Sequence, residues 1–225
     1  MAGLNKVVYK LAAAVALAAG LTGCANTLTT NVSNFNQWPN NAQGATYTIA
    51  PAPESSSWSE LERKTYEGYV AQRLQQQGLR PAAQAAAARM VVDMQVQSRR
   101  ENIRVTTPTY VPAPYYGPWG WRYDDYWCDD GWMARRVGSM CLVERTTVQA
   151  VDVHQLQVRI RDRSQKGAGA EAPAVFESKA EYVGQAPLSS VMSYLVASVF
   201  DQFPGKNGEV HRVQFDTDTG LIKKR

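Results

Sequence analysis

Hydrophobic and polar residues alternate along most of the chain, and this period of two is typical of half-buried β-strands. The alternation is clearest after residue 89, where Met90, Val92 and Met94 are interleaved with Asp93 and Gln95. The pattern predicts strands over residues 26–39, 45–50, 90–97 with continuation toward 105, 140–153, 156–163, 174–182 and 210–215. Segments rich in turn residues, such as 40–44 and 165–173, separate several of them.

Two segments follow a helical period instead. The stretch Ser57-Trp58-Ser59-Glu60 has the spacing of a capping box, in which Ser57 and Glu60 would each satisfy a free amide. The helix is predicted to run to about Gln77, with Gly78 as the left-handed residue that ends it. A second helix is expected from Pro187 to the Phe203-Pro204-Gly205 stretch. Its apolar residues form one stripe: Leu188, Val191, Met192, Leu195, Val199 and Phe203.

The resulting order is β-β-α-β, an insert, then β-β-β-α-β. Strands that alternate in this way with only two helices are typical of the α+β class. We therefore expect a mostly antiparallel sheet with two helices packed on one face. Residues 27–216 are predicted to form this single domain, and residues 217–225 a polar tail. The insert at 107–139 is rich in proline, glycine and aromatic residues, and we expect it to be irregular.

The N-terminal segment is organised as a signal peptide. It has a basic start with Lys6 and Lys10, followed by a short apolar run at 11–21. This run leads into Leu21-Thr22-Gly23-Cys24, which resembles the bacterial lipobox. The resemblance implies removal of residues 1–23 and lipidation of Cys24, so that residues 24–26 become a lipidated N-terminus. An ordinary secretory signal with a chance cysteine, or a short membrane anchor, is the alternative.

The lipobox also suggests a location. Ala25 follows the cysteine, where an aspartate usually retains such lipoproteins in the inner membrane. The resemblance therefore implies a lipid anchor in the outer membrane of a Gram-negative bacterium, with the protein facing the periplasm. Several acyl chains, each methylene contributing roughly 0.8 kcal/mol, would hold it there.

Charge argues against one class of partner. The 225 residues contain 24 Lys and Arg against 20 Asp and Glu, and loss of residues 1–23 reduces the net charge from +4 to +2. The basic residues form no long cluster of the kind that nucleic-acid binding requires. We therefore expect no nucleic-acid partner.

With Cys24 assigned to the lipid, two cysteines remain in an oxidising compartment. Cys128 and Cys141 enclose a loop of about 14 residues, and a disulfide there would contribute about 3 kcal/mol. Two free or metal-binding thiols are the alternative, but the chain has no CxxC motif. We predict the disulfide, and no metal site or cofactor.

The insert is the most distinctive segment for function. Aromatic residues of this kind are enriched at binding surfaces, because two torsions order a large contact area. Tyr110 is the first aromatic residue of the insert. The candidate binding surface comprises the eight that follow it: Tyr115, Tyr116, Trp119, Trp121, Tyr123, Tyr126, Trp127 and Trp132. Such a surface would suit an envelope protein or a glycan. The alternative is that these rings fold back over the sheet as a lid.

Several further stretches resemble the bacterial lipoproteins grouped as domain of unknown function 4136. These are the helix end at 74–79 followed by Ala88-Arg89-Met90-Val91-Val92, the strand at 156–162, and the strand at 174–180. A helix that closes on Phe203-Pro204 is similar as well. Two positions depart from the family pattern: Arg89 stands where an acid is common, and Phe176 where tryptophan is common. The resemblance implies an α+β envelope lipoprotein with no established activity.

Catalytic motifs are weak in this sequence. The acidic loop Asp124–Asp130 has adjacent carboxylates, whereas a glycosidase needs two carboxyls across a cleft. Gly167–Ala172 fits a dinucleotide fingerprint, but Pro173 and the strand pattern after it leave no helix for a pyrophosphate. Only two histidines occur, His154 and His211, and we interpret His154 as a turn or packing residue. We therefore expect a non-catalytic envelope lipoprotein that binds through its insert. The alternative is an envelope hydrolase with the acidic loop in its site.

Overall fold

A computed structural model describes residues 27–51, 58–112, 136–137, 140–165 and 172–223. Two compact units can be distinguished. The first, here called the sheet unit, contains the described residues up to Gln97, His154–Tyr182 and those from Leu188 onward. The second, here called the ribbon unit, contains Ser98–Val153 and Val183–Pro187. Strands β4 and β6 belong in part to each unit.

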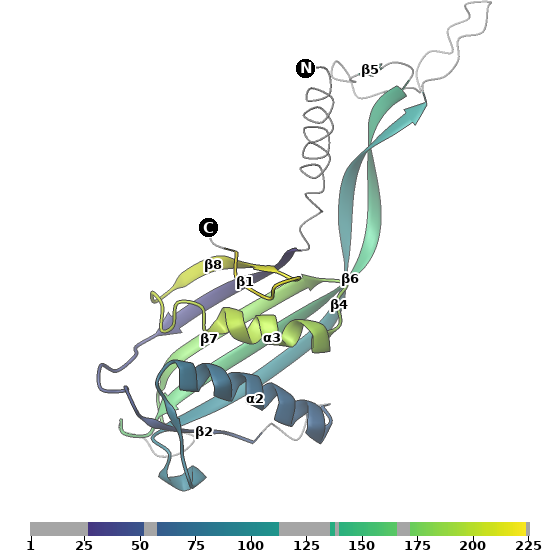
Figure 1. Ribbon diagram of the computed structural model, residues 1–225. Helices are drawn as coiled ribbons and strands as arrows, with labels where there is room; N and C mark the ends of the chain where they lie inside the picture. Colours follow the sequence, from purple (N-terminus) through teal and green to yellow (C-terminus); the bar gives the residue numbers. More distant parts are fainter. Residues whose placement is uncertain (1–26, 52–57, 113–135, 138–139, 166–171, 224–225) are drawn as a thin grey trace, which may run out of the picture. The chain divides into compact units, whose positions relative to one another are not determined.

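Strands and helices are interspersed along the described chain (Figure 1). They are β1 (Thr27–Asn36), β2 (Thr46–Ile49), α2 (Glu60–Gln76), β3 (Arg80–Pro81), the 3₁₀ helix η1 (Ala85–Ala87), β4 (Met90–Pro112), β5 (Arg136–Val137), β6 (Met140–Asp162), β7 (Ala174–Gly184), α3 (Leu188–Val199) and β8 (Glu209–Asp216). The strand order in the sheet is β3-β2-β4-β6-β7-β1-β8, with β5 paired to β6.

The expectation of a mostly antiparallel sheet was wrong, because the sheet is mixed. Strand β1 lies antiparallel to β7 and β8, but β2 lies parallel to both β3 and β4. The parallel pairs arise because the chain leaves β2, passes through α2 and returns to the same edge of the sheet in β3 and β4. A crossover through a helix brings the next strand back in the same direction. The α+β class and the two helices are as predicted.

Helix α2 begins two residues later than the capping box at Ser57 predicted. The N-cap is Ser59, whose hydroxyl accepts from the amide of Glu62, while the Glu62 carboxylate accepts from the amide of Ser59. The spacing Ser-x-x-Glu occurs twice in Ser57–Glu62, so that the sequence alone did not distinguish them. At the other end the prediction is confirmed: Gly78 has φ +87°.

Both helices cover the same face of the sheet (Figure 1). Helix α2 buries Tyr66, Val70 and Leu74, and α3 buries the predicted stripe from Val191 to Val199. The sheet contributes alternate residues of its strands to the same core, among them Met90 and Val92 of β4, Leu156, Val158 and Ile160 of β6, and Val32 of β1. Helix α3 ends at Val199, four residues before the predicted Phe203.

The central strands are longer than the alternation predicted. Strand β4 runs through the expected insert boundary to Pro112, and β6 joins two predicted strands into one of 23 residues. Pro108 lies within β4 and does not end it, since proline is tolerated in a strand where no ladder hydrogen bond requires its nitrogen. His154 lies within β6, where it is buried and stacks on Tyr182 with ring centroids 6.3 Å apart. It is therefore a packing residue and not part of a turn.

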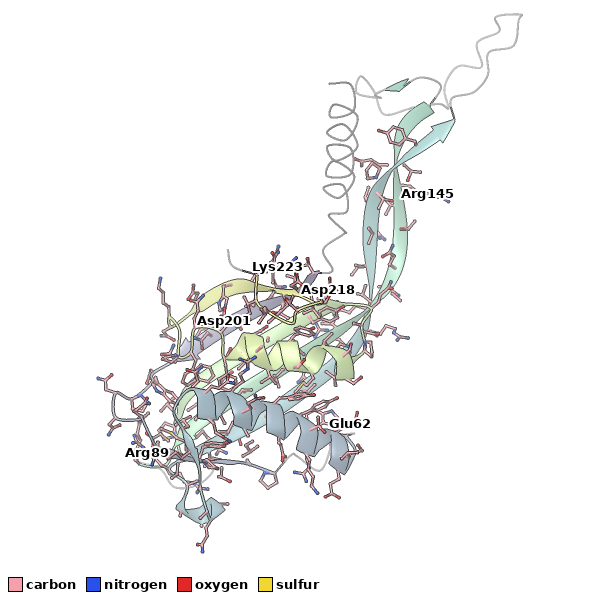
Figure 2. All side chains as sticks on the ribbon, viewed as in Figure 1. Glu62, Arg89, Arg145, Asp201, Asp218 and Lys223 are labelled. Carbon is pink, nitrogen blue, oxygen red and sulfur yellow. The ribbon has the colours of Figure 1, made fainter. Side chains whose placement is uncertain are left out.

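The segment after β8 folds back along that strand. The amide of Lys223 donates to the carbonyl of Gln214 (2.7 Å), and the Lys223 ammonium lies 3.0 Å from the Thr27 hydroxyl. Residues 217–223, expected to be a polar tail, thus pair with the edge of the sheet up to Lys223 (Figure 2).

Candidate functional site

The ribbon unit contains the parts of β4 and β6 that flank the aromatic insert. Cross-strand contacts hold these parts together: Thr106 and Thr146 share a hydrogen bond of 3.0 Å, and the Arg100 guanidinium donates to the Asp152 carboxylate at 2.9 Å. The hydrogen bond to Asp152 raises the pKa of Arg100. From Arg100 to Thr106 along β4, the partner residue in β6 changes from Asp152 back to Thr146, so the two strands are antiparallel here.

Most described side chains of this ribbon are not buried, and Val151 and Val153 are the exceptions. Residues 144–150 are all exposed, including Val148 at 66% and Arg145 (Figure 2). A two-stranded ribbon whose side chains are mostly not buried covers little apolar area, and ribbons of this kind are marginally stable by themselves. The ribbon thus provides a framework for the loop between Pro112 and Met140 and contributes little core of its own.

Most of the predicted site residues fall outside the described part of the chain. This applies to Cys24, to Cys128, to the acidic loop Asp124–Asp130, and to eight aromatic residues: Tyr115, Tyr116, Trp119, Trp121, Tyr123, Tyr126, Trp127 and Trp132. Cys141 is placed in β6, where its backbone pairs with Arg136 of β5, but the predicted disulfide stays a prediction. Of the aromatic residues named for the insert, Tyr110 is described, and 53% of its surface is exposed.

The second feature is a polar groove in the sheet unit, on the face away from the helices. It measures about 270 Å³ and is lined by Pro51, Asp93, Met94, Gln95, Gln157, Arg159 and Arg161. The charged side chains come from neighbouring strands, because every second residue of β4 and β6 points to this face. Their polar character is visible in the sequence as the outward half of the alternation, but the sequence did not show that they meet in one groove.

Ion pairs organise this groove. The Arg161 guanidinium donates twice to the Asp93 carboxylate, from Nε and Nη2, both at 2.8 Å. The Arg159 guanidinium donates through Nε to Glu177 of β7 at 3.2 Å. Glu177 also accepts from the Gln157 amide at 2.9 Å. Each carboxylate is therefore neutralised by a basic neighbour, an arrangement suited to hydrogen bonding with a polar ligand and not to acid–base chemistry by a carboxylate pair.

A third ionic site, formed by Arg89 and Asp162, is structural; Arg89 is labelled in Figure 2. Arg89 donates to both carboxylate oxygens of the fully buried Asp162, at 3.1 and 2.8 Å, and to the side chain of Asn41 at 2.7 Å. Burial by itself raises the pKa of the Asp162 carboxyl, but hydrogen bonds from Arg89 and Ser164 more than offset this, and the pKa lies below its ordinary value. The arginine that departs from the family pattern thus joins the start of β4 to the end of β6.

The second histidine also packs in the sheet unit. The His211 imidazole of β8 is buried, and its Nε2 lies 3.5 Å from the carboxylate of Asp201. Neither histidine lies in the polar groove. Within the described residues, no three histidine, cysteine or acidic side chains gather as a metal site would require. No helix among those residues is long and apolar enough to cross a membrane.

The fold therefore defines an α+β protein whose mixed sheet is covered on one face by two helices. The chain belongs to the family described as "Domain of unknown function (DUF4136)", which matches residues 31–205. The resemblance found in the sequence motifs is confirmed. Because the family is one of unknown function, membership assigns no activity to the chain.

Comparison with solved structures finds matches of low sequence identity. A PelC dodecamer from Paraburkholderia phytofirmans is 15% identical, with a TM-score of 0.40 over 79% of this chain and 99% of that one. A DUF4136 family protein from Bacteroides thetaiotaomicron is 14% identical, with a TM-score of 0.39 over 82% and 99%. A PDZ domain protein from Parabacteroides distasonis is 11% identical, with a TM-score of 0.47 over 88% of this chain and 41% of that one. Among curated proteins, none matches the sequence.

Proposed function

We propose that this protein is a non-catalytic envelope lipoprotein, anchored in the outer membrane through Cys24, that binds a periplasmic partner through its aromatic insert. The partner is an envelope protein or a glycan. The observation that carries the proposal is the ribbon: the long strands β4 and β6 continue from the sheet unit into the ribbon unit, most of their described side chains there are not buried, and the aromatic insert connects the two strands in the sequence.

The ribbon favours a binding role because it contributes little to the stability of the fold. Strand residues whose side chains remain in water contribute little to the free energy of folding. A loop on a hydrogen-bonded ribbon is instead the usual arrangement for a recognition element positioned by a scaffold. Large rings in such a loop supply contact area at low entropic cost.

Site-specific crosslinking tests the proposal. A photoreactive phenylalanine at Trp119 or Trp127, in cells that express the full chain, is expected to capture a discrete adduct. The matched control carries the same probe at Lys64 of α2, which is exposed in the sheet unit. Capture of the same adducts, with the same yield, from Lys64 and from the insert would contradict a role for the insert.

Deletion of residues 113–135, with a short glycine–serine turn in their place, gives the complementary measurement. We expect the fold to be kept, because neither helix nor the core strands are altered, and the adducts formed by a probe at Tyr110 to disappear. Retention of these adducts would place the contact elsewhere.

The anchor is tested separately by Cys24→Ala. This substitution is expected to leave the protein unprocessed or soluble, because the thioether cannot form. A chain that still fractionates with outer membranes in a lipidated form would refute the proposed lipid anchor at Cys24. The acidic loop Asp124–Asp130 of the alternative, an envelope hydrolase, lies outside the described residues.

A further inference from the structure

The groove on the open face of the sheet lies where one strand stops and its neighbour continues. Strand β2 pairs with β4 only as far as Ile49 and Val92, and the amide of Ala50 donates to the carbonyl of Val92 at 2.8 Å. Main-chain groups of alternate residues point to the same side of a strand. The N–H and C=O of Met94 therefore point to the side on which β2 has ended.

This orientation explains why Met94 lines a polar groove. Its side chain belongs to the covered face and is buried. Met94 therefore offers the groove its main-chain donor and acceptor, at a strand edge with which no described residue beyond Ala50 pairs. Beside it are the amide side chain of Gln95 and the ring of Pro51, which closes one end of the groove. Open edges of this type pair with extended chains.

Arg159 supplies the charge. Asp93 is held by both donors of Arg161, and Glu177 takes only Nε of Arg159. Among the described residues none accepts a hydrogen bond from Nη1 or Nη2 of Arg159, and 42% of its side chain is exposed. The planar fork of a guanidinium matches a carboxylate with two parallel hydrogen bonds. The Nη1 and Nη2 donors of Arg159 thus remain for a ligand carboxylate, while its Nε stays paired with Glu177.

We propose that this groove binds an extended acidic peptide segment of a partner protein, which adds as a strand to the open edge of β4 at Met94 and places a carboxylate on Arg159. Neighbouring strands are about 4.8 Å apart, so an added strand lies about 10 Å from β6. A glutamate and an arginine side chain span that distance together. The inference is separate from the role of the insert, because every residue that lines the groove belongs to the sheet unit.

Peptide binding to the full-length protein, purified in detergent, tests this directly. The probe is a fluorescein-labelled seven-residue peptide that alternates threonine and glutamate, TETETET, and fluorescence anisotropy measures its affinity. We expect it to bind at least tenfold more tightly than the neutral peptide TQTQTQT, and to weaken with added salt. Equal affinity for the two peptides, or no binding of either at millimolar protein, would overturn the proposal.

Variants locate the site. Arg159→Gln is expected to weaken TETETET binding about tenfold, and Arg159→Lys nearly as much, because lysine keeps the charge but lacks the fork. The matched control is Arg73→Gln, which removes an arginine from α2 outside the groove and should leave the affinity unchanged. Melting temperatures of the three variants should agree, so that a loss of binding cannot be attributed to unfolding. Binding of TETETET to Arg159→Gln with wild-type affinity would refute the site.

Main-chain pairing is tested with the same peptide methylated on alternate backbone nitrogens. Methylation of the amides that face Met94 is expected to abolish binding, whereas methylation of the opposite set should be tolerated. If both methylated peptides bind as well as the parent and tetragalacturonate displaces them, the groove recognises an acidic glycan and the peptide proposal is wrong.

Discussion

The two units share β4 and β6 but use these strands differently. In the sheet unit, one face of each strand is covered by α2 and α3, and buried residues such as Val158 alternate with polar ones such as Arg159. In the ribbon unit, the same strands remain paired, but residues 144–150 of β6 are exposed, Val148 among them, and of its described residues only Val151 and Val153 are buried. The comparison teaches that a strand and its hydrogen bonds do not define a core, since stability follows from the apolar area that is covered.

Matched substitutions along β6 test this comparison, beginning with two aspartates. Asp162→Asn is expected to lower the free energy of unfolding by about 3 kcal/mol, because it removes the charge that faces Arg89 in a buried pair. Asp152→Asn, which breaks the exposed pair with Arg100, should leave stability unchanged. Urea denaturation measures both. Similar losses at the two positions would show that the ribbon unit is as strongly coupled to folding as the sheet unit.

Two valines of the same strand give the second test. Val158→Ala removes two methyl groups from the fully buried core, and we expect a loss of about 2 kcal/mol. Val148→Ala removes the same groups from an exposed position and should change stability by less than about 0.5 kcal/mol. Thermal unfolding of the two variants side by side provides the measurement. A large effect at Val148 would reveal that its face of the ribbon is covered in solution.

Acid should act on the sheet unit through Asp162. Its pKa is lowered in the folded protein, so its contribution is present above the ordinary value of 3.8 and is lost as the pH falls through the folded pKa. Between the two pKa values the unfolded chain binds a proton that the folded chain does not, and stability falls by about 1.4 kcal/mol per pH unit from this group. Urea titrations from pH 5 to pH 2.5 should show the wild type approaching Asp162→Asn. A constant difference between the two curves would disprove the linkage.

The smallest difference in stability is expected between substitutions of two threonines. The Thr30 hydroxyl is buried and lies 2.6 Å from that of Ser198, and Thr30→Val is expected to cost about 1 kcal/mol. The exposed Thr106 makes a comparable bond to Thr146, but water replaces it, and Thr106→Val should be close to neutral. Equal costs, measured by chemical denaturation, would argue that exposure does not distinguish these two hydrogen bonds.

Several parts of the fold were predictable because their signals are local. Alternation located most strands, the stripe from Val191 to Val199 located the face of α3, and Gly78 marked the end of α2. The sequence offers two starts for α2, because Ser57 and Ser59 each precede a glutamate by three residues. Strand direction was not predictable in this way: period two is the same in parallel and antiparallel pairs, and only the return of the chain through α2 set β2 parallel to β4.

The candidate sites differ in the same way: some can be recognised from local sequence, and others form only when distant residues meet. Aromatic residues and a lipobox are recognisable in a linear sequence, because they depend on residue type and spacing. The groove is not, because Asp93 and Arg161 are 68 positions apart and meet only when β4 and β6 pair. Likewise, no sequence signal near Arg89 indicated that it would form an ion pair with Asp162.

The sequence by itself thus determined most of the elements, the family and the segment to which we assign binding, since each depends on neighbouring residues. The tertiary structure alone decided which faces are covered, which strands run parallel and which charges meet. These depend on contacts between residues far apart in the chain, where the free energy of burial and pairing, and not local propensity, selects the arrangement.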